Sequence, residues 1–198
     1  LLNATHNKDL VGMDFAEIGR MRNCHPYDAV LDILLEEGKD MMACFWTSRS
    51  FRDSDVDLCL SQAECAVISD TVATANEGIL KDHLGSLSGY GWAARFLQYY
   101  VRDREILSLA EGLAKLTSIP AKRLGLKGRG YLKNGFHADI CVFDKVNIAS
   151  NVTAKTPRRY ASGICHVLVN GQFSMRDGTR TPVNAGQVIR EFEARAAS

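Results

Sequence analysis

A single carboxylate stands where an apolar run of this sequence stops. The run Ala66–Ile68 is followed directly by Ser69 and Asp70. Such a run predicts a buried strand, and a carboxylate held at the end of a strand can act as a general base and then as a general acid. The pattern taken alone fits equally well an Asp that caps a helix or stabilises a turn.

Asp70 belongs to a part of the chain in which helices alternate with short apolar runs. Capping patterns and a proline predict helices that begin near Asp14, Pro26 and Ser54. Apolar runs at 41–45 and 66–69 predict two buried strands. This order is typical of parallel βα units, and barrels built from such units keep their chemistry at the carboxyl ends of the strands.

The stretch after Asp70 predicts a long loop and then more helix. Residues 71–90 are rich in Gly, Ser, Thr and Asn, and loops of this length often carry function. A capping box at Ser108–Glu111 begins a further helix. Aromatic residues at helical spacing predict a helix that packs on the core: Trp92, Phe96, Tyr99 and Tyr100.

Beyond Gly125 the apolar pattern changes to a period of two. Asn170-Gly171 is the commonest two-residue hairpin signal, and Asp177-Gly178 marks a second turn. We therefore expect a small antiparallel β module over residues 126–190, with the domain boundary near Leu126 and a polar tail at 191–198.

Composition excludes several classes of partner. The 24 basic and 23 acidic residues give a net charge of +1, so no electrostatic case exists for nucleic acid or for an anionic membrane. No apolar run approaches the roughly 20 residues of a membrane span. The six cysteines are scattered without a C-x-x-C pair, which favours a reducing, cytoplasmic location with free thiols.

Three stretches of the sequence together resemble one family. The first is NCHPYDAVLDILLEEGKDMMACFW followed by AVISD, the second is LSLAEGLAKLTSIPAKRLGLKGRGYLKNGFHADICVFD, and the third is ICHVLVNGQFSMRDGTRT with GQVIR. The chain looks like the C-terminal part of an N-acyl-D-amino-acid deacylase, from the D-aminoacylase-like branch of the amidohydrolase superfamily.

The resemblance implies a fold, a reaction and a metal. It makes residues 1–125 the C-terminal βα units of a (β/α)8 TIM-like barrel, and 126–190 the C-terminal strands of a small β-sandwich. It implies zinc-dependent hydrolysis of a linear amide, with metal-bound hydroxide as nucleophile and Asp70 as the matching catalytic residue and metal ligand. The family's other ligands lie on earlier strands, so the expected partner is the N-terminal part of the same enzyme, on this or a separate chain.

The resemblance also suggests where substrate binds. Relatives place a pocket-lining hydroxyl near the position of Thr5, and the loop after Asp70 offers a list of further candidates: His83, Ser86, Ser88 and Tyr90. Relatives often carry an arginine in this loop that can bind the substrate carboxylate. Here no arginine precedes Arg95, which puts the usual amino-acid specificity in doubt.

Two alternatives remain open. One is a cyclic amidohydrolase of the dihydroorotase or hydantoinase kind, which needs no clamp for a free amino-acid carboxylate. The other is a non-catalytic subunit that completes a partner's barrel, which the missing ligands and a first residue, Leu1, other than Met would suit. A homo-oligomer is compatible with either.

Overall fold

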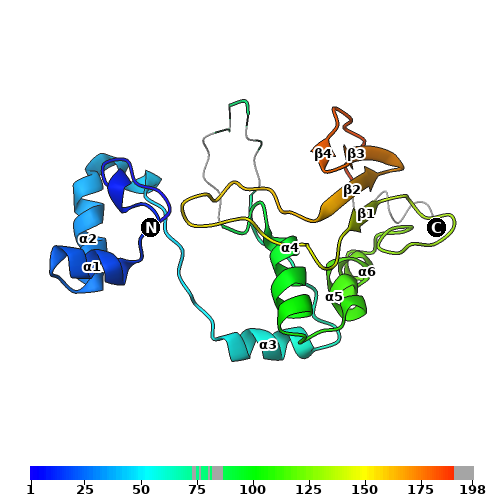
Figure 1. The fold of residues 1–198 in the computed structure, drawn as a ribbon, viewed down its shortest axis with the longest axis horizontal. Helices are drawn as coiled ribbons and strands as arrows, with labels where there is room; N and C mark the ends of the chain where they lie inside the picture. Colours follow the sequence, from blue (N-terminus) through cyan, green and yellow to red (C-terminus); the bar gives the residue numbers. More distant parts are fainter. Residues whose placement is uncertain (73–74, 76, 80, 82–86, 190–198) are drawn as a thin grey trace. The chain divides into compact units, whose positions relative to one another are not determined.

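The computed structural model describes residues 1–72, 75, 77–79, 81 and 87–189, which form two compact units (Figure 1). Unit 1 holds 1–50, the described residues of 71–90, and 152–159. Unit 2 holds 51–70, 91–151 and the described residues from 160 onward. The boundary near Leu126 stays a prediction, and the tail at 191–198 lies outside the described residues.

Two helices make up most of unit 1. Helix α1 (Phe15–Arg22) begins with a reciprocal capping box between Asp14 and Glu17, as the sequence predicts. Helix α2 (Pro26–Glu37) begins with proline in its first turn and ends at Gly38. The short 3-10 helices η1 (Lys8–Leu10) and η2 (Gly38–Ala43) lie beside them in the sequence. The buried core of this unit consists of Leu1, Ala4, Leu10, Ile18, Ala29 and Ile33.

The predicted strand at 41–45 is wrong. Its first three residues belong to η2, and Phe45 alone forms an isolated antiparallel bridge with Asn3. The Phe45 N–H donates to the Asn3 carbonyl at 3.0 Å, and the Phe45 carbonyl accepts from Leu2 at 2.7 Å. An apolar run indicates burial, but a strand also requires a neighbouring strand, and here the bridge extends over one residue pair.

The predicted strand at 66–69 is also wrong. Among the described residues this segment belongs to no sheet, and the Val67 N–H donates instead to the Lys115 carbonyl at 3.0 Å. The described elements of unit 2 up to residue 123 are helices. They are α3 (Asp53–Ser61), α4 (Trp92–Phe96), the π-helix η3 (Leu97–Asp103), α5 (Leu109–Leu116) and α6 (Ser118–Arg123).

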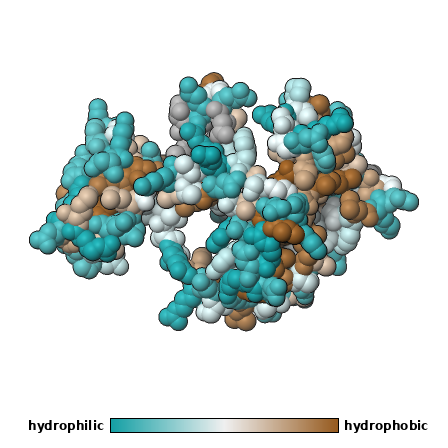
Figure 2. All heavy atoms as spheres, viewed as in Figure 1, coloured by the Kyte–Doolittle hydropathy of each residue, from teal (hydrophilic) through white to brown (hydrophobic). Residues whose placement is uncertain are grey.

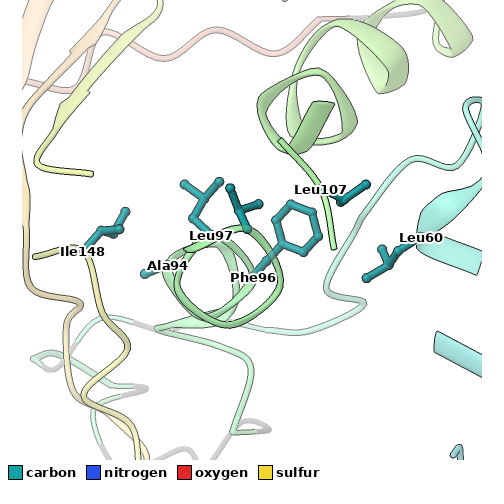
Figure 3. Close-up of a cluster of buried hydrophobic side chains, with 7 residues drawn as sticks. Leu60, Ala94, Phe96, Leu97, Leu107 and Ile148 are labelled. Carbon is teal, nitrogen blue, oxygen red and sulfur yellow. The ribbon is translucent and has the colours of Figure 1, made fainter. Parts of the chain in front are cut away.

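These helices enclose the core of unit 2 (Figure 3). Its buried members are Leu60, Ala94, Phe96, Leu97, Val101, Leu107 and Ile148. Gly112 of α5 allows a close approach to η3, because a Cβ atom at this position would lie 2.5 Å from Cγ2 of Val101. The predicted aromatic helix therefore packs on the core, with Phe96 as its buried ring.

The antiparallel module follows the helices. Strands β1 (Ile140–Phe143), β2 (Ile164–Val169), β3 (Gln172–Arg176) and β4 (Thr179–Arg180) form one sheet in sequence order. Asn170 and Gly171 join β2 to β3 with φ of 48° and 78°. Both values lie in the left-handed region that this hairpin turn requires, so the predicted hairpin is confirmed.

Apolar side chains also reach the surface of both units (Figure 2). On α2 they include Tyr27, Leu31 and Leu35, which are 76%, 59% and 79% exposed. Among the described residues, no helix combines the length and apolar character that crossing a bilayer requires.

Candidate functional site

Asp70 lies at the end of an irregular segment of unit 2, with its side chain exposed. Its φ of 42° lies in the left-handed region, which Asp and Asn tolerate better than most residues. The carboxylate makes no hydrogen bond or ion pair with a described residue, and no helix begins at the described residues that follow it. Within the described chain Asp70 therefore has no capping role, and both carboxylate oxygens stay available.

The segment that leads to Asp70 is fixed although it is not a strand. Val67 packs against the core of unit 2 and bonds through its N–H to the carbonyl of Lys115. The next side chain, Ile68, is 76% exposed. The backbone thus leaves the core three residues before Asp70.

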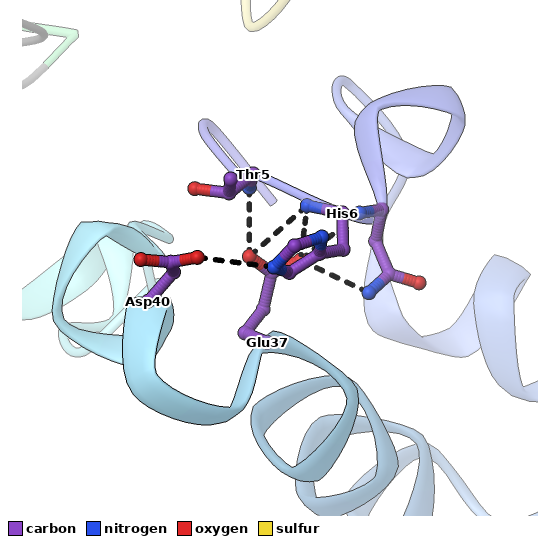
Figure 4. A network of polar contacts seen from close by, with 5 residues as sticks. Thr5, His6, Glu37 and Asp40 are labelled. Carbon is purple, nitrogen blue, oxygen red and sulfur yellow. Dashed lines mark hydrogen bonds and ion pairs between the residues drawn. The ribbon is translucent and has the colours of Figure 1, made fainter.

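The predicted pocket residue Thr5 lies on a loop of unit 1 built around Glu37 (Figure 4). The Glu37 carboxylate accepts the N–H of Thr5 at 2.7 Å, of His6 at 3.0 Å and of Asn7 at 2.9 Å. The Asn7 side chain adds a fourth donor at 3.0 Å. Thr5 itself is exposed, and its hydroxyl has no partner among the described residues.

This loop depends on a buried negative charge. Glu37 continues the buried face of α2 after Ala29 and Ile33, and its exposed fraction is 1%. Burial opposes its ionisation, but the bonds from Asn7, Thr5 and His6 outweigh burial and lower the pKa of Glu37 to about 2. Glu37 is therefore ionised at neutral pH, and it holds the backbone from which the Thr5 hydroxyl projects.

An ion pair and a contact between a histidine and an aspartate involve residues close to Glu37 in the sequence or on its loop. Arg22 binds Glu36 through both terminal nitrogens at 2.8 and 2.9 Å and also donates to the Asn7 side chain. His6 Nε2 lies 3.1 Å from Asp40 Oδ2, with the His6 side chain 53% exposed. These contacts connect the loop to the last residue of α1, to the last turn of α2 and to η2.

The remaining predicted residues lie in the segment after Asp70. Ser88 and Tyr90 are half-buried in a turn at 87–90 of unit 1, and each has an interaction partner. His83 and Ser86 lie outside the described residues. Glu37 and His6 were not among the residues predicted from the sequence. The i, i+4 spacing of Ala29, Ile33 and Glu37 was the signal that places a carboxylate on the apolar face of α2.

The described residues fit a zinc ion only in part. A carboxylate oxygen such as that of Asp70 is a suitable zinc ligand, but a catalytic site takes three protein ligands. Among the described residues, no three His, Cys, Asp or Glu side chains gather in a way that could hold a metal ion. Asp70 can thus contribute one ligand, and the described part of the chain supplies no complete site.

Comparison with known proteins places the chain in a family. The model of the amidohydrolase family matches residues 72–175, and the chain belongs to this family. It is 36% identical over 105 residues to a D-aminoacylase of Alcaligenes xylosoxydans xylosoxydans, an overlap that covers 53% of this chain and 22% of that protein. It is 39% identical over 80 residues to a dihydroorotase of Endomicrobium trichonymphae, covering 35% of this chain and 19% of that protein.

A solved structure shares the fold. The crystal structure of a D-aminoacylase matches with a TM-score of 0.65 and 26% identity, over 91% of this chain and 35% of that chain. This likeness confirms the predicted D-aminoacylase-like α/β fold class. The chain spans about a fifth of the length of the two curated relatives named above.

Proposed function

We propose that this chain contributes Asp70 to the active site of an enzyme that hydrolyses a linear amide, namely the amide of an N-acyl-D-amino acid. The observation that carries the proposal is an exposed carboxylate without a partner among the described residues, in a member of the amidohydrolase family that is similar to a D-aminoacylase. The structural alternative from the sequence was an Asp that caps a helix or closes a turn, and Asp70 does neither among the described residues.

Amide hydrolysis requires a nucleophile stronger than water and a proton for the leaving nitrogen. A carboxylate within hydrogen-bond reach of the attacking water takes its proton and passes it to the amine. We assign both roles to Asp70, which serves first as base and then as acid. Zinc, when bound, lowers the pKa of its water to about 7 and polarises the carbonyl group.

We propose Thr5, on the unit 1 loop, as a substrate-binding residue. The Thr5 hydroxyl can donate a hydrogen bond to an acyl or carboxylate oxygen, and the bonds to Glu37 restrict the backbone that carries it. His83, Ser86, Ser88 and Tyr90 stay proposed pocket residues. The remaining metal ligands are proposed to come from the rest of the enzyme, and a cytoplasmic location agrees with the scattered cysteines.

The substitution Asp70→Asn in the intact enzyme tests this function. We expect kcat for N-acetyl-D-amino acids to fall by at least about 100-fold, the lower end of what proton transfer contributes. Asn fits the same left-handed backbone, so the fold should persist. The matched control is Asp177→Asn, which should leave kcat unchanged. Asp177 is an exposed aspartate with φ of 49° in the turn between β3 and β4.

Two results would overturn the proposal. If Asp70→Asn keeps full kcat, Asp70 takes no part in the reaction and the non-catalytic alternative gains support. If the intact enzyme hydrolyses dihydroorotate faster than any N-acyl-amino acid, the cyclic amidohydrolase is the better assignment, as the similarity to a dihydroorotase allows.

A further inference from the structure

Lys115 is a buried cation at the end of α5. It is 3% exposed, and within the described residues only Glu37 is a charged residue of comparable burial. A lysine in the last turn of a helix ordinarily extends into water, since the desolvation of an ammonium group is costly without acceptors. Its burial here therefore calls for a set of partners.

Those partners belong to the segment that leads to Asp70. The Lys115 ammonium donates to the carbonyl of Gln62 at 2.6 Å and to that of Cys65 at 3.3 Å. The Lys115 carbonyl accepts the N–H of Val67 at 3.0 Å. One residue thus binds the segment at three points through both its side chain and its backbone.

One of the two ammonium bonds goes to a carbonyl that already has a donor within the segment. The Gln62 carbonyl already accepts the Cys65 N–H at 3.1 Å, which closes a turn. The ammonium adds a second bond to this carbonyl and so ties the turn to α5. A second bond of the same kind comes from α6, where Arg123 donates to the Glu64 carbonyl at 2.6 Å.

The backbone that Lys115 binds ends close to the proposed catalytic group. Val67 is the last residue bound to α5, and Asp70 follows three residues later, a distance of roughly 10 Å along an extended chain. No sheet pairing fixes the residues between Val67 and Asp70 in the described chain, so the location of the Asp70 carboxylate depends on where α5 holds the segment at 62–67.

We propose that Lys115 is a positioning residue that sets the location of the Asp70 carboxylate. The inference rests on the proposed function of Asp70. The Lys115 ammonium donates to backbone carbonyls before Asp70, and we assign it no role of its own in proton transfer. Its loss should therefore change the rate of the chemical step and leave substrate affinity almost unaltered.

The test uses Lys115→Met in the intact enzyme, with Lys122→Met as the matched control. Met preserves the unbranched side chain and the helix propensity but removes the donors. We expect kcat to fall roughly 10- to 100-fold, as for a misplaced catalytic group, with KM within about twofold. Lys122, which is exposed in α6, should tolerate the same substitution without loss of kcat.

A double-mutant cycle separates positioning from general stabilisation. If Lys115 acts through Asp70, adding Lys115→Met to Asp70→Asn should cause little further loss of the residual kcat. Full multiplication of the two losses would overturn the inference, as would an unchanged kcat for Lys115→Met. Normal kcat for Asp70→Asn would instead contradict the proposed function, so the two failures are distinguishable.

A second variant covers the case in which Lys115→Met does not fold. Lys115→Arg keeps a cation and donors but places them differently, so it should fold and give an intermediate loss of kcat at normal KM. The same cycle with Asp70→Asn applies to it. A loss confined to KM would contradict the positioning role.

Discussion

Units 1 and 2 each contain a segment that carries a candidate site residue. A buried charge holds each segment, and the two charges have opposite signs. In unit 1 the carboxylate of Glu37 accepts N–H groups from the loop at Thr5–Asn7. In unit 2 the ammonium of Lys115 donates to carbonyl groups before Asp70. Within the described residues, neither the loop at Thr5–Asn7 nor the segment before Asp70 pairs in a sheet, and the nearest bridge is at Asn3. The backbone groups of both segments therefore need other partners. The sign of each charge matches the backbone group that it satisfies.

The two anchors differ in how completely they are satisfied. Glu37 meets three backbone donors and the Asn7 side chain, which together lower its pKa to about 2 despite its burial. Lys115 meets two carbonyl groups, and one of these has another donor in Cys65. The Glu37 carboxylate is therefore the main hydrogen-bond acceptor of its loop. The Lys115 ammonium instead adds hydrogen bonds to a turn that can also close without them.

This difference predicts the largest effect on stability for Glu37. Glu37→Met would leave the N–H groups of Thr5–Asn7 without their acceptor inside the protein, so we expect it to lower the unfolding midpoint more than Lys115→Met. The latter leaves chiefly the Cys65 carbonyl unsatisfied, at a cost of about 1–3 kcal/mol. Chemical denaturation of the intact enzyme measures both.

Hydrogen exchange adds a crossed control to that comparison. Glu37→Met should speed amide exchange at 5–7 and leave the segment at 62–67 unchanged, while Lys115→Met should do the reverse. If either variant loosens both segments equally, the two anchors do not act locally and the comparison fails.

Local signals in the sequence predicted much of the fold. The capping boxes at Asp14 and Ser108 and the hairpin at Asn170-Gly171 each involve residues within three positions of one another, and all three form as predicted. Their hydrogen bonds require no distant partner, so composition and spacing are sufficient to predict them.

The failures share a dependence on distant partners. The apolar runs at 41–45 and 66–69 predicted buried strands, but Met42 and Ile68 are 85% and 76% exposed, and nothing local specifies a neighbouring strand. The bond from Lys115 to Gln62 spans 53 positions, and a lysine in the last turn of an amphipathic helix is typical of a solvated surface. The family resemblance singled out Asp70, yet the residues that hold its segment could not be found from the pattern.

The titration of Glu37 predicts an intermediate, pH-dependent effect. Its pKa in the folded protein, about 2, lies below the ordinary 4.5, so its contribution is fully present above pH 4.5 and is lost as the pH falls through 2. We expect the stability difference between the native enzyme and Glu37→Gln to shrink over this range. Denaturation at stepped pH measures it, and a difference that stays constant down to pH 2 would contradict a charge-dependent anchor.

The smallest effect is expected for the pair that flanks the same loop. His6 and Asp40 lie 3.1 Å apart, but their side chains are 53% and 36% exposed, so solvent screens the interaction. Asp40→Asn should change the free energy of unfolding by less than about 1 kcal/mol, close to the effect of Asp9→Asn, an exposed aspartate of the same unit. Denaturation of both variants at neutral pH provides the measurement. If Asp40→Asn destabilises the enzyme as much as Glu37→Gln does, the loop is held by its outer pair as well, and burial is not what distinguishes the anchor at Glu37.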